Sequence, residues 1–126
     1  MAEGTPATRI MIFLSEDDRV GRRGLHDLLL ERAREDGLAG ATLWRGTEGF
    51  GRTGHVRTDR FLDASIGLPL ALEIIDDAEK IEAFLPTIQR LAPHSFVTRE
   101  EVQTKRFATV SRAPLDDPGP GSIRQT

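Results

Sequence analysis

Residues 68–76 read LPLALEIID and decide the fold, because large apolar side chains alternate there with smaller or polar ones. Every second residue from Leu68 to Ile74 is a leucine or an isoleucine, which is typical of a strand with one apolar face. Pro69 fits an edge strand or the first position of a strand, since proline cannot donate a ladder hydrogen bond. We therefore predict a half-buried strand over 68–74, with Glu73 on the face opposite the leucines.

The residues after this strand predict a helix and a final strand. Asp76 or Asp77 is suited to cap the helix. The apolar stripe of the helix consists of Ile81, Phe84, Leu85, Ile88 and Leu91. Pro86 falls within that stripe, so we expect a kink or an early break there. Residues 96–106 predict a last strand that is irregular in its middle.

The N-terminal half has the same order of elements. Residues 10–14 are apolar on both faces, which predicts a central strand. Apolar residues then recur at helical spacing from Leu25 to Ala33, and Gly37 is the expected C-terminal stop. Residues 41–45 predict a second strand. A long segment without core candidates separates that strand from the one over 68–74.

The order strand, helix, strand, loop, strand, helix, strand predicts an α+β ferredoxin-like βαββαβ fold. Its four-stranded antiparallel sheet carries two helices on one face, and a long loop joins strands 2 and 3. The side chains expected on the other face are Phe13, Trp44, Ala71 and Glu73. Such a mixed face needs a cover, so the pattern favours an oligomer. We expect a flexible N-terminal tail over 1–8, the domain over 9–107 and a disordered Pro/Gly-rich tail over 108–126.

Composition excludes several classes of protein. Lys and Arg number 17 against 20 Asp and Glu, a net charge of −3, which argues against a generally basic nucleic-acid binder. Cysteine is absent, which excludes disulfides, thiol catalysis and cysteine-ligated metals. No apolar run approaches the roughly 20 residues that cross a bilayer. The first residues do not resemble a secretory signal, so we expect a soluble cytoplasmic protein.

The segment that follows the second strand carries the functional signal. Residues 45–55 read RGTEGFGRTGH, with four glycines around Phe50 and a histidine at the end. Glycines let backbone N–H groups converge on an anion, and arginine offers a forked donor to phosphate. A solvated hairpin would have a similar sequence.

No two of His26, His55 and His94 have the spacing of metal ligands on a helix, so we predict no metal site.

Several stretches together resemble PII signalling proteins, and most of all a PII-like branch known as domain of unknown function number 190. The stretches are 12–17 (IFLSED), 24–29 (GLHDLL), 37–46 (GLAGATLWRG), 49–51 (GFG) and 68–76 (LPLALEIID). The similarity runs through most of residues 9–107. The segment 46–66 resembles the T-loop of that family.

The resemblance implies a homotrimer that binds an adenine nucleotide in clefts between subunits and is not an enzyme. Its T-loop would respond to the ligand and dock on a protein partner, such as a transporter or an enzyme. On this basis the ligand-binding residues are Arg45, Gly46, Gly49, Phe50, Gly51, His55 and Glu73. Arg52, Arg57 and Arg60 would contact the partner protein.

The chain departs from PII proteins at three points. Thr53 stands where PII proteins have a glutamine that helps to bind magnesium and 2-oxoglutarate. The chain contains no tyrosine, so the T-loop tyrosine that some PII proteins modify is missing. Residues 91–96 replace the Gly-rich, Lys-containing B-loop expected after the second helix. We therefore predict neither 2-oxoglutarate sensing nor uridylylation, and we expect nucleotide binding in a different mode.

Two other functions remain open at this point. The first is a small ferredoxin-like enzyme that uses the sheet face as a cavity, with His55 or Glu73 as the base. The long Gly-rich segment argues against it, because catalytic groups work best on rigid elements. The second is a purely structural interaction module without a ligand.

Overall fold

The computed structural model describes residues 4–51, 53–59 and 67–107, which form four long strands, two helices and two short hairpins. The long strands are β1 (Thr5–Ser15), β4 (Ala41–Arg45), β7 (Pro69–Asp76) and β8 (Phe96–Thr104). The helices are α1 (Leu25–Glu35) and α2 (Ala78–Leu91). The hairpins pair β2 (Arg19–Val20) with β3 (Arg23–Gly24), and β5 (Glu48–Gly49) with β6 (Arg57–Thr58).

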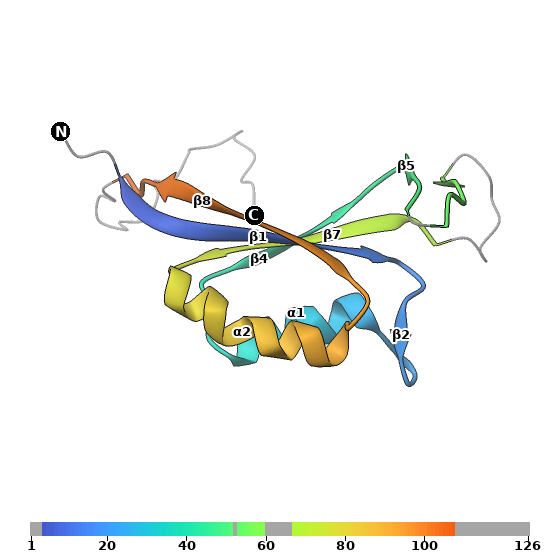
Figure 1. The fold of residues 1–126 in the computed structure, drawn as a ribbon, viewed down its shortest axis with the longest axis horizontal. Coiled ribbons are helices and arrows are strands. Elements are labelled where there is room, and N and C mark those ends of the chain that lie inside the picture. The colour runs from blue at the N-terminus through green and yellow to red at the C-terminus, as the bar shows by residue number, and fades with distance from the viewer. Residues whose placement is uncertain (1–3, 52, 60–66, 108–126) are drawn as a thin grey trace, which may run out of the picture.

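The four long strands form one antiparallel sheet in the order β4-β7-β1-β8. Both helices lie against the same face of this sheet (Figure 1). The start of β1 and the end of β8 lie at one end of the sheet, whereas β5 lies at the other (Figure 1). The predicted α+β ferredoxin-like fold is therefore confirmed.

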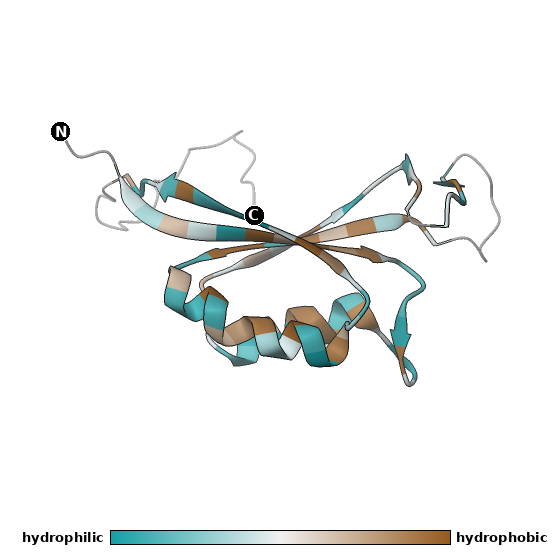
Figure 2. Ribbon diagram, viewed as in Figure 1, coloured by the Kyte–Doolittle hydropathy of each residue, from teal (hydrophilic) through white to brown (hydrophobic). Residues whose placement is uncertain are grey.

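Alternation along the two inner strands builds the core. Three residues of β1 and three of β7 point toward the helices and are buried: Ile10, Ile12, Leu14, Leu70, Leu72 and Ile74. The helices contribute Leu25, Leu29, Ala33, Ile81, Phe84 and Ile88. Both helices turn apolar residues toward the sheet (Figure 2). Because the predicted stripes supply most of these residues, hydrophobic periodicity explains the packing.

Three local predictions are wrong in detail. The strand β1 begins at Thr5, and Ala7 and Thr8 are buried, so residues 5–8 belong to the sheet rather than to a flexible tail. The helix α2 continues through Pro86 to Leu91 without an early break. The strand β8 is continuous from Phe96 to Thr104 and ends before Arg106.

Pro69 and Asp76 are the two end residues of β7. Pro69 is the first residue of β7, and β7 lies inside the sheet, so the alternative of an edge strand is wrong. Asp77 occupies the N-cap position of α2, but its side chain makes no capping hydrogen bond. Asp76 instead accepts a hydrogen bond from the Ala39 N–H at 2.8 Å. This contact ties the end of β7 to the segment before β4.

The sheet face opposite the helices exposes large aromatic side chains. Trp44 is 55% exposed, Phe13 is 42% exposed and Phe96 is 68% exposed. The register places Phe13 beside Ala71 of β7 and beside Phe96 of β8. This is the mixed apolar and polar face that the sequence predicts.

Candidate functional site

A pocket of about 800 Å³ lies at the end of the sheet that carries β5. Segments far apart in the sequence line it. Most of the lining comes from the end of β1 with the turn after it, from described residues between 49 and 57 at the base of the predicted T-loop, and from the α2–β8 connection from 91 to 96. Leu25 of α1 and Pro69 and Leu70 of β7 complete the lining. The pocket is large enough for a small organic ligand.

Four of the predicted ligand-binding residues line this pocket: Gly49, Phe50, Gly51 and His55. The short β5–β6 hairpin holds them, and two backbone bonds support it: Asp59 N–H donates to the Thr47 carbonyl at 3.0 Å, and Gly54 N–H donates to the Gly51 carbonyl at 2.9 Å. Gly54 has φ +76°, a conformation that favours glycine. Part of the segment that the sequence predicts to bind a ligand therefore forms one wall of this pocket.

The other predicted ligand-binding residues lie outside the pocket lining. Arg45 pairs with Glu16 through Nη2 and Oε2 at 2.6 Å. Gly46 donates its N–H to the Pro69 carbonyl at 2.8 Å, and a Cβ there would lie 3.0 Å from the Pro69 ring. Gly46 thus allows the close approach of two backbones at the base of the loop.

Glu73 lies on the open sheet face in a polar cluster of its own. Its Oε2 accepts a bond from Arg9 Nε at 2.5 Å, and its Oε1 accepts a bond from Trp44 Nε1 at 2.9 Å. The hydrogen bond from Arg9, followed by that from Trp44, lowers the pKa of Glu73 below its ordinary value. A carboxylate held ionised with both oxygens engaged is poorly suited to act as a general base.

The pKa shift of Glu73 predicts a pH-dependent contribution to stability. Because the pKa of Glu73 is lower in the folded than in the unfolded protein, the ionised carboxylate stabilises the folded state at pH values above its ordinary pKa of 4.5. This stabilisation is lost as the pH falls through the pKa of the folded state. Glu73→Gln should therefore be less stable than the wild type at about pH 7, and the difference should shrink as the pH falls below about 4.5. Urea unfolding over this range measures the difference. Glu79→Gln, on the exposed side of α2, is the control, and a Glu73→Gln deficit that does not vary with pH would contradict the assignment.

The opposite wall of the pocket contains residues that the sequence did not identify as site residues. His94 lies just before β8, and Phe96 is the first residue of β8. Both line the pocket together with Phe13 of β1 and Arg19 of β2. The rings of Phe13 and Phe96 have centroids 5.9 Å apart at 42°. The sequence pointed to 91–96 only as the place where the resemblance expects a Gly-rich B-loop, and these residues contain no glycine.

Arg57 also lines the pocket, although the sequence assigned it to partner binding. Its Nη1 donates to Asp17 Oδ2 at 3.1 Å and to the Gly67 carbonyl at 3.2 Å. Arg52 and Arg60, the other two residues predicted to contact a partner, lie outside the described residues. The acidic turn 16–18 therefore contacts the base of the predicted T-loop through both Arg45 and Arg57.

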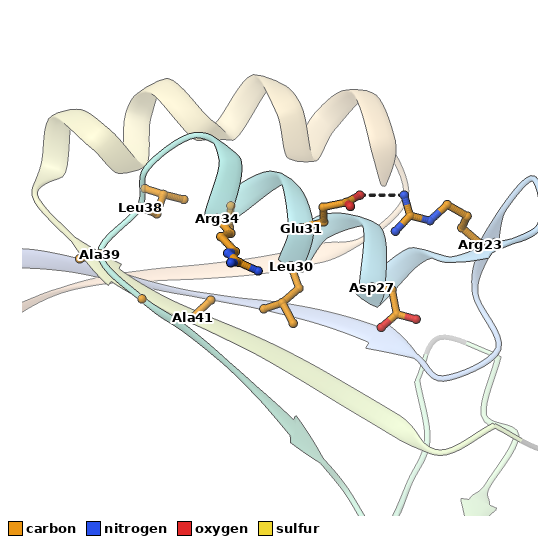
Figure 3. A pocket seen from close by; sticks show the side chains of 10 residues that line it. Arg23, Asp27, Leu30, Glu31, Arg34, Leu38, Ala39 and Ala41 are labelled. Atoms are coloured by element: carbon orange, nitrogen blue, oxygen red, sulfur yellow. Dashed lines mark hydrogen bonds and ion pairs between the residues drawn. The ribbon is translucent and has the colours of Figure 1, made fainter.

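A second cavity, of about 610 Å³, lies between α1 and β4 (Figure 3). Leu30 and Leu38 line it together with charged residues of α1. Two of its charged side chains pair with each other, Arg23 Nη1 with Glu31 Oε1 at 2.7 Å (Figure 3). None of the residues predicted to bind a ligand lines this cavity.

Two kinds of feature are absent from residues 4–51, 53–59 and 67–107. No three His, Asp or Glu side chains gather there in a way that could hold a metal ion. No helix there is long and apolar enough to cross a membrane.

Comparison with known proteins identifies relatives along most of the chain. The model of the family DUF190, described as Uncharacterized ACR, matches residues 7–104. A UPF0166 protein of Aquifex aeolicus (strain VF5) is 38% identical over 94 residues, covering 75% of this chain and 89% of the relative. A UPF0166 protein of Methanocaldococcus jannaschii is 29% identical over 79 residues, covering 63% and 72%.

Solved structures share the fold. A putative PII-like signalling protein from Thermus thermophilus matches with a TM-score of 0.58 and 24% identity, over 80% of this chain and 91% of that one. CPII from Thiomonas intermedia K12, bound to ADP and bicarbonate, matches with a TM-score of 0.60 and 14% identity, over 80% and 90%. At these identities the likeness establishes the PII-like fold.

Proposed function

The chain belongs to the DUF190 family, and from that premise we propose that it is a PII-like regulatory protein that binds an adenine nucleotide. The observation that carries the proposal is the pocket that joins the Gly49–Gly51 stretch to the α2–β8 connection. Three phenylalanine rings, Phe13, Phe50 and Phe96, line it together with two arginines. Rings and guanidinium groups are suited to a base and to phosphates, respectively.

We further propose that the protein works as a homotrimer. The open sheet face supports this, because it exposes Trp44, Phe13 and Phe96 beside the polar cluster of Glu73 and Arg9. Burial against another subunit would remove these aromatic surfaces from water. Phe13 and Phe96 belong both to this face and to the pocket lining, so a neighbouring subunit on the face would complete the pocket as an intersubunit cleft.

In the proposed mechanism, the nucleotide alters the segment 46–66 and thereby its contact with a protein partner. A ligand shifts such an equilibrium only if it prefers one state of the segment. The residues at the base of the segment, Gly49 to Gly51, line the pocket, so a bound nucleotide would contact the segment directly. A regulatory role fits better than catalysis with Glu73 as the base, because Glu73 is engaged by Arg9 and Trp44 and does not line the pocket.

Thermal unfolding with a panel of nucleotides tests the proposal. ADP and AMP come first, since Thiomonas CPII structures hold them, followed by ATP, cyclic AMP, cyclic di-AMP and S-adenosylmethionine. A ligand at about a hundred times its dissociation constant should stabilise the native state by about 2.7 kcal/mol. For a domain of this size that is a rise in Tm of several degrees. A flat response to the whole panel would contradict nucleotide binding, and sedimentation would test the trimer separately.

A further inference from the structure

We infer that Arg57 is the phosphate-binding side chain of the pocket and that Asp17 positions it. The inference rests on the proposed function and deepens it, because it names the part of the ligand that this side chain recognises. It also changes the role that the sequence assigned to Arg57, from contact with a protein partner to contact with a nucleoside diphosphate.

Arg57 is placed so that its side chain lies at the pocket. Arg57 lies on β6, its side chain is 30% exposed, and it lines the pocket. Its Nη1 donates to both Asp17 Oδ2 and the Gly67 carbonyl, at 3.1 and 3.2 Å. Two acceptors on one nitrogen fix the plane of the guanidinium, and among the described residues they engage one of its three nitrogens. A planar fork held in this way is pre-organised for phosphate oxygens.

Hydrogen bonds and close packing hold the turn that contacts Arg57 in place. Asp17 Oδ1 accepts a bond from Ser15 Oγ at 2.5 Å, and Asp18 Oδ2 accepts one from Ser15 N–H at 2.8 Å. Gly67 approaches this turn so closely that a Cβ would lie 2.7 Å from the Asp17 nitrogen. The hydrogen bond from Ser15, and after it that from Arg57, lowers the pKa of Asp17, so its carboxylate remains a charged acceptor.

Arg45 pairs with the same turn but differs from Arg57 in its position relative to the pocket. The same turn holds Arg45 through Glu16, Nη2 to Oε2 at 2.6 Å, but Arg45 does not line the pocket. Two arginines therefore pair with adjacent carboxylates, and of these two Arg57 lines the cavity whereas Arg45 does not. The other charged or titratable groups of the lining are Asp18, Arg19, His55 and His94. Asp18 turns its carboxylate to the Ser15 backbone, which leaves the pocket wall near Arg57 suited to an anion.

Calorimetric titration of the full chain with ADP and, separately, with inorganic pyrophosphate tests the inference. Arg57→Gln should weaken binding of both by about tenfold to hundredfold, the usual effect of losing a charge-assisted hydrogen bond. Arg45→Gln is the matched control, with the same substitution beside the same turn, and should change affinity less than about twofold. Arg57→Lys keeps the charge without the fork and should give an intermediate affinity. Thermal unfolding shows that each variant is folded.

Variants of Asp17 test its positioning role. Asp17→Asn keeps an acceptor for Arg57 and should preserve pyrophosphate affinity, whereas Asp17→Ala removes the acceptor and should lower it several-fold. Equal losses in the Arg57 and Arg45 variants, or no loss in the Arg57 variant, would overturn the inference. Arg57-dependent binding of pyrophosphate without binding of any nucleotide would support the inference and refute the proposed function. Nucleotide binding that does not depend on Arg57 would do the reverse, and a wild type that binds neither probe would overturn both.

Discussion

Valine in place of Gly51 is expected to weaken ADP binding by about tenfold to hundredfold and to leave the stability of the protein unchanged. Gly51 lines the pocket, and a Cβ at this position would meet no atom of another described residue within 4 Å. The added methyl groups would therefore fit the unliganded protein and occupy space that the ligand needs. Overpacking of this kind costs about 1–3 kcal/mol, which corresponds to the expected loss of affinity.

Gly40→Val is the matched control for this experiment. Gly40 is exposed, a Cβ there also meets no atom within 4 Å, and the residue lines the α1–β4 cavity instead. Calorimetric titration with ADP should give the wild-type affinity for Gly40→Val and a strongly reduced one for Gly51→Val, with equal melting temperatures without ligand. If Gly51→Val binds ADP as tightly as the wild type, the nucleotide does not occupy this pocket.

The largest expected loss of stability follows from Phe84→Ala. Phe84 is 1% exposed in the core between α2 and the sheet. Removal of a buried phenylalanine ring costs about 3–5 kcal/mol, because apolar contacts are lost and a cavity remains. Since domains of this kind have free energies of unfolding of about 5–15 kcal/mol, the variant should lose about a fifth of its stability or more.

Urea unfolding followed by circular dichroism measures this loss. Phe107→Ala, at a residue that is 77% exposed, is the control and should change the free energy of unfolding by less than about 0.5 kcal/mol. Phe84→Leu keeps most of the apolar volume, so it should remain folded even if Phe84→Ala does not. A loss below about 1 kcal/mol in Phe84→Ala would mean that the helix does not depend on this contact.

Much of the fold could be predicted because its elements have strong periodicity. The alternation over 68–76 and the stripe of α2 predicted which residues would be buried. The errors occur where tertiary contacts outweigh local preference. Thr5 to Thr8 look like a polar tail, but they pair with β8, whose residues lie more than 90 positions away. Pro86 disfavours a helix locally, yet α2 continues, with Thr87 and Ile88 buried directly after it.

The candidate site was predictable on one side only. The glycines around Phe50 indicate a ligand loop, and two of the four, Gly49 and Gly51, line the pocket. The opposite wall, with His94 and Phe96, has no local signal, because only the packing of α2 and β8 brings it to the loop. The arginines of 45–60 are equivalent in the sequence. The structure distinguishes Arg57 from Arg45, because both pair with the acidic turn but only Arg57 of the two lines the pocket.

The base of the 46–66 segment has a consequence for how the family can diversify. Gly46 N–H meets the Pro69 carbonyl at 2.8 Å, and Glu16 N–H meets that of Leu68 at 2.8 Å, so the sheet itself brings the two ends of the segment together. Loop-closure entropy then grows only with the logarithm of length, and doubling the segment would cost only about 0.6 kcal/mol. Insertions and deletions beyond this base therefore cost the scaffold little. Descendants of one ancestral gene can carry segments of different length and sequence on a sheet and core that stay the same.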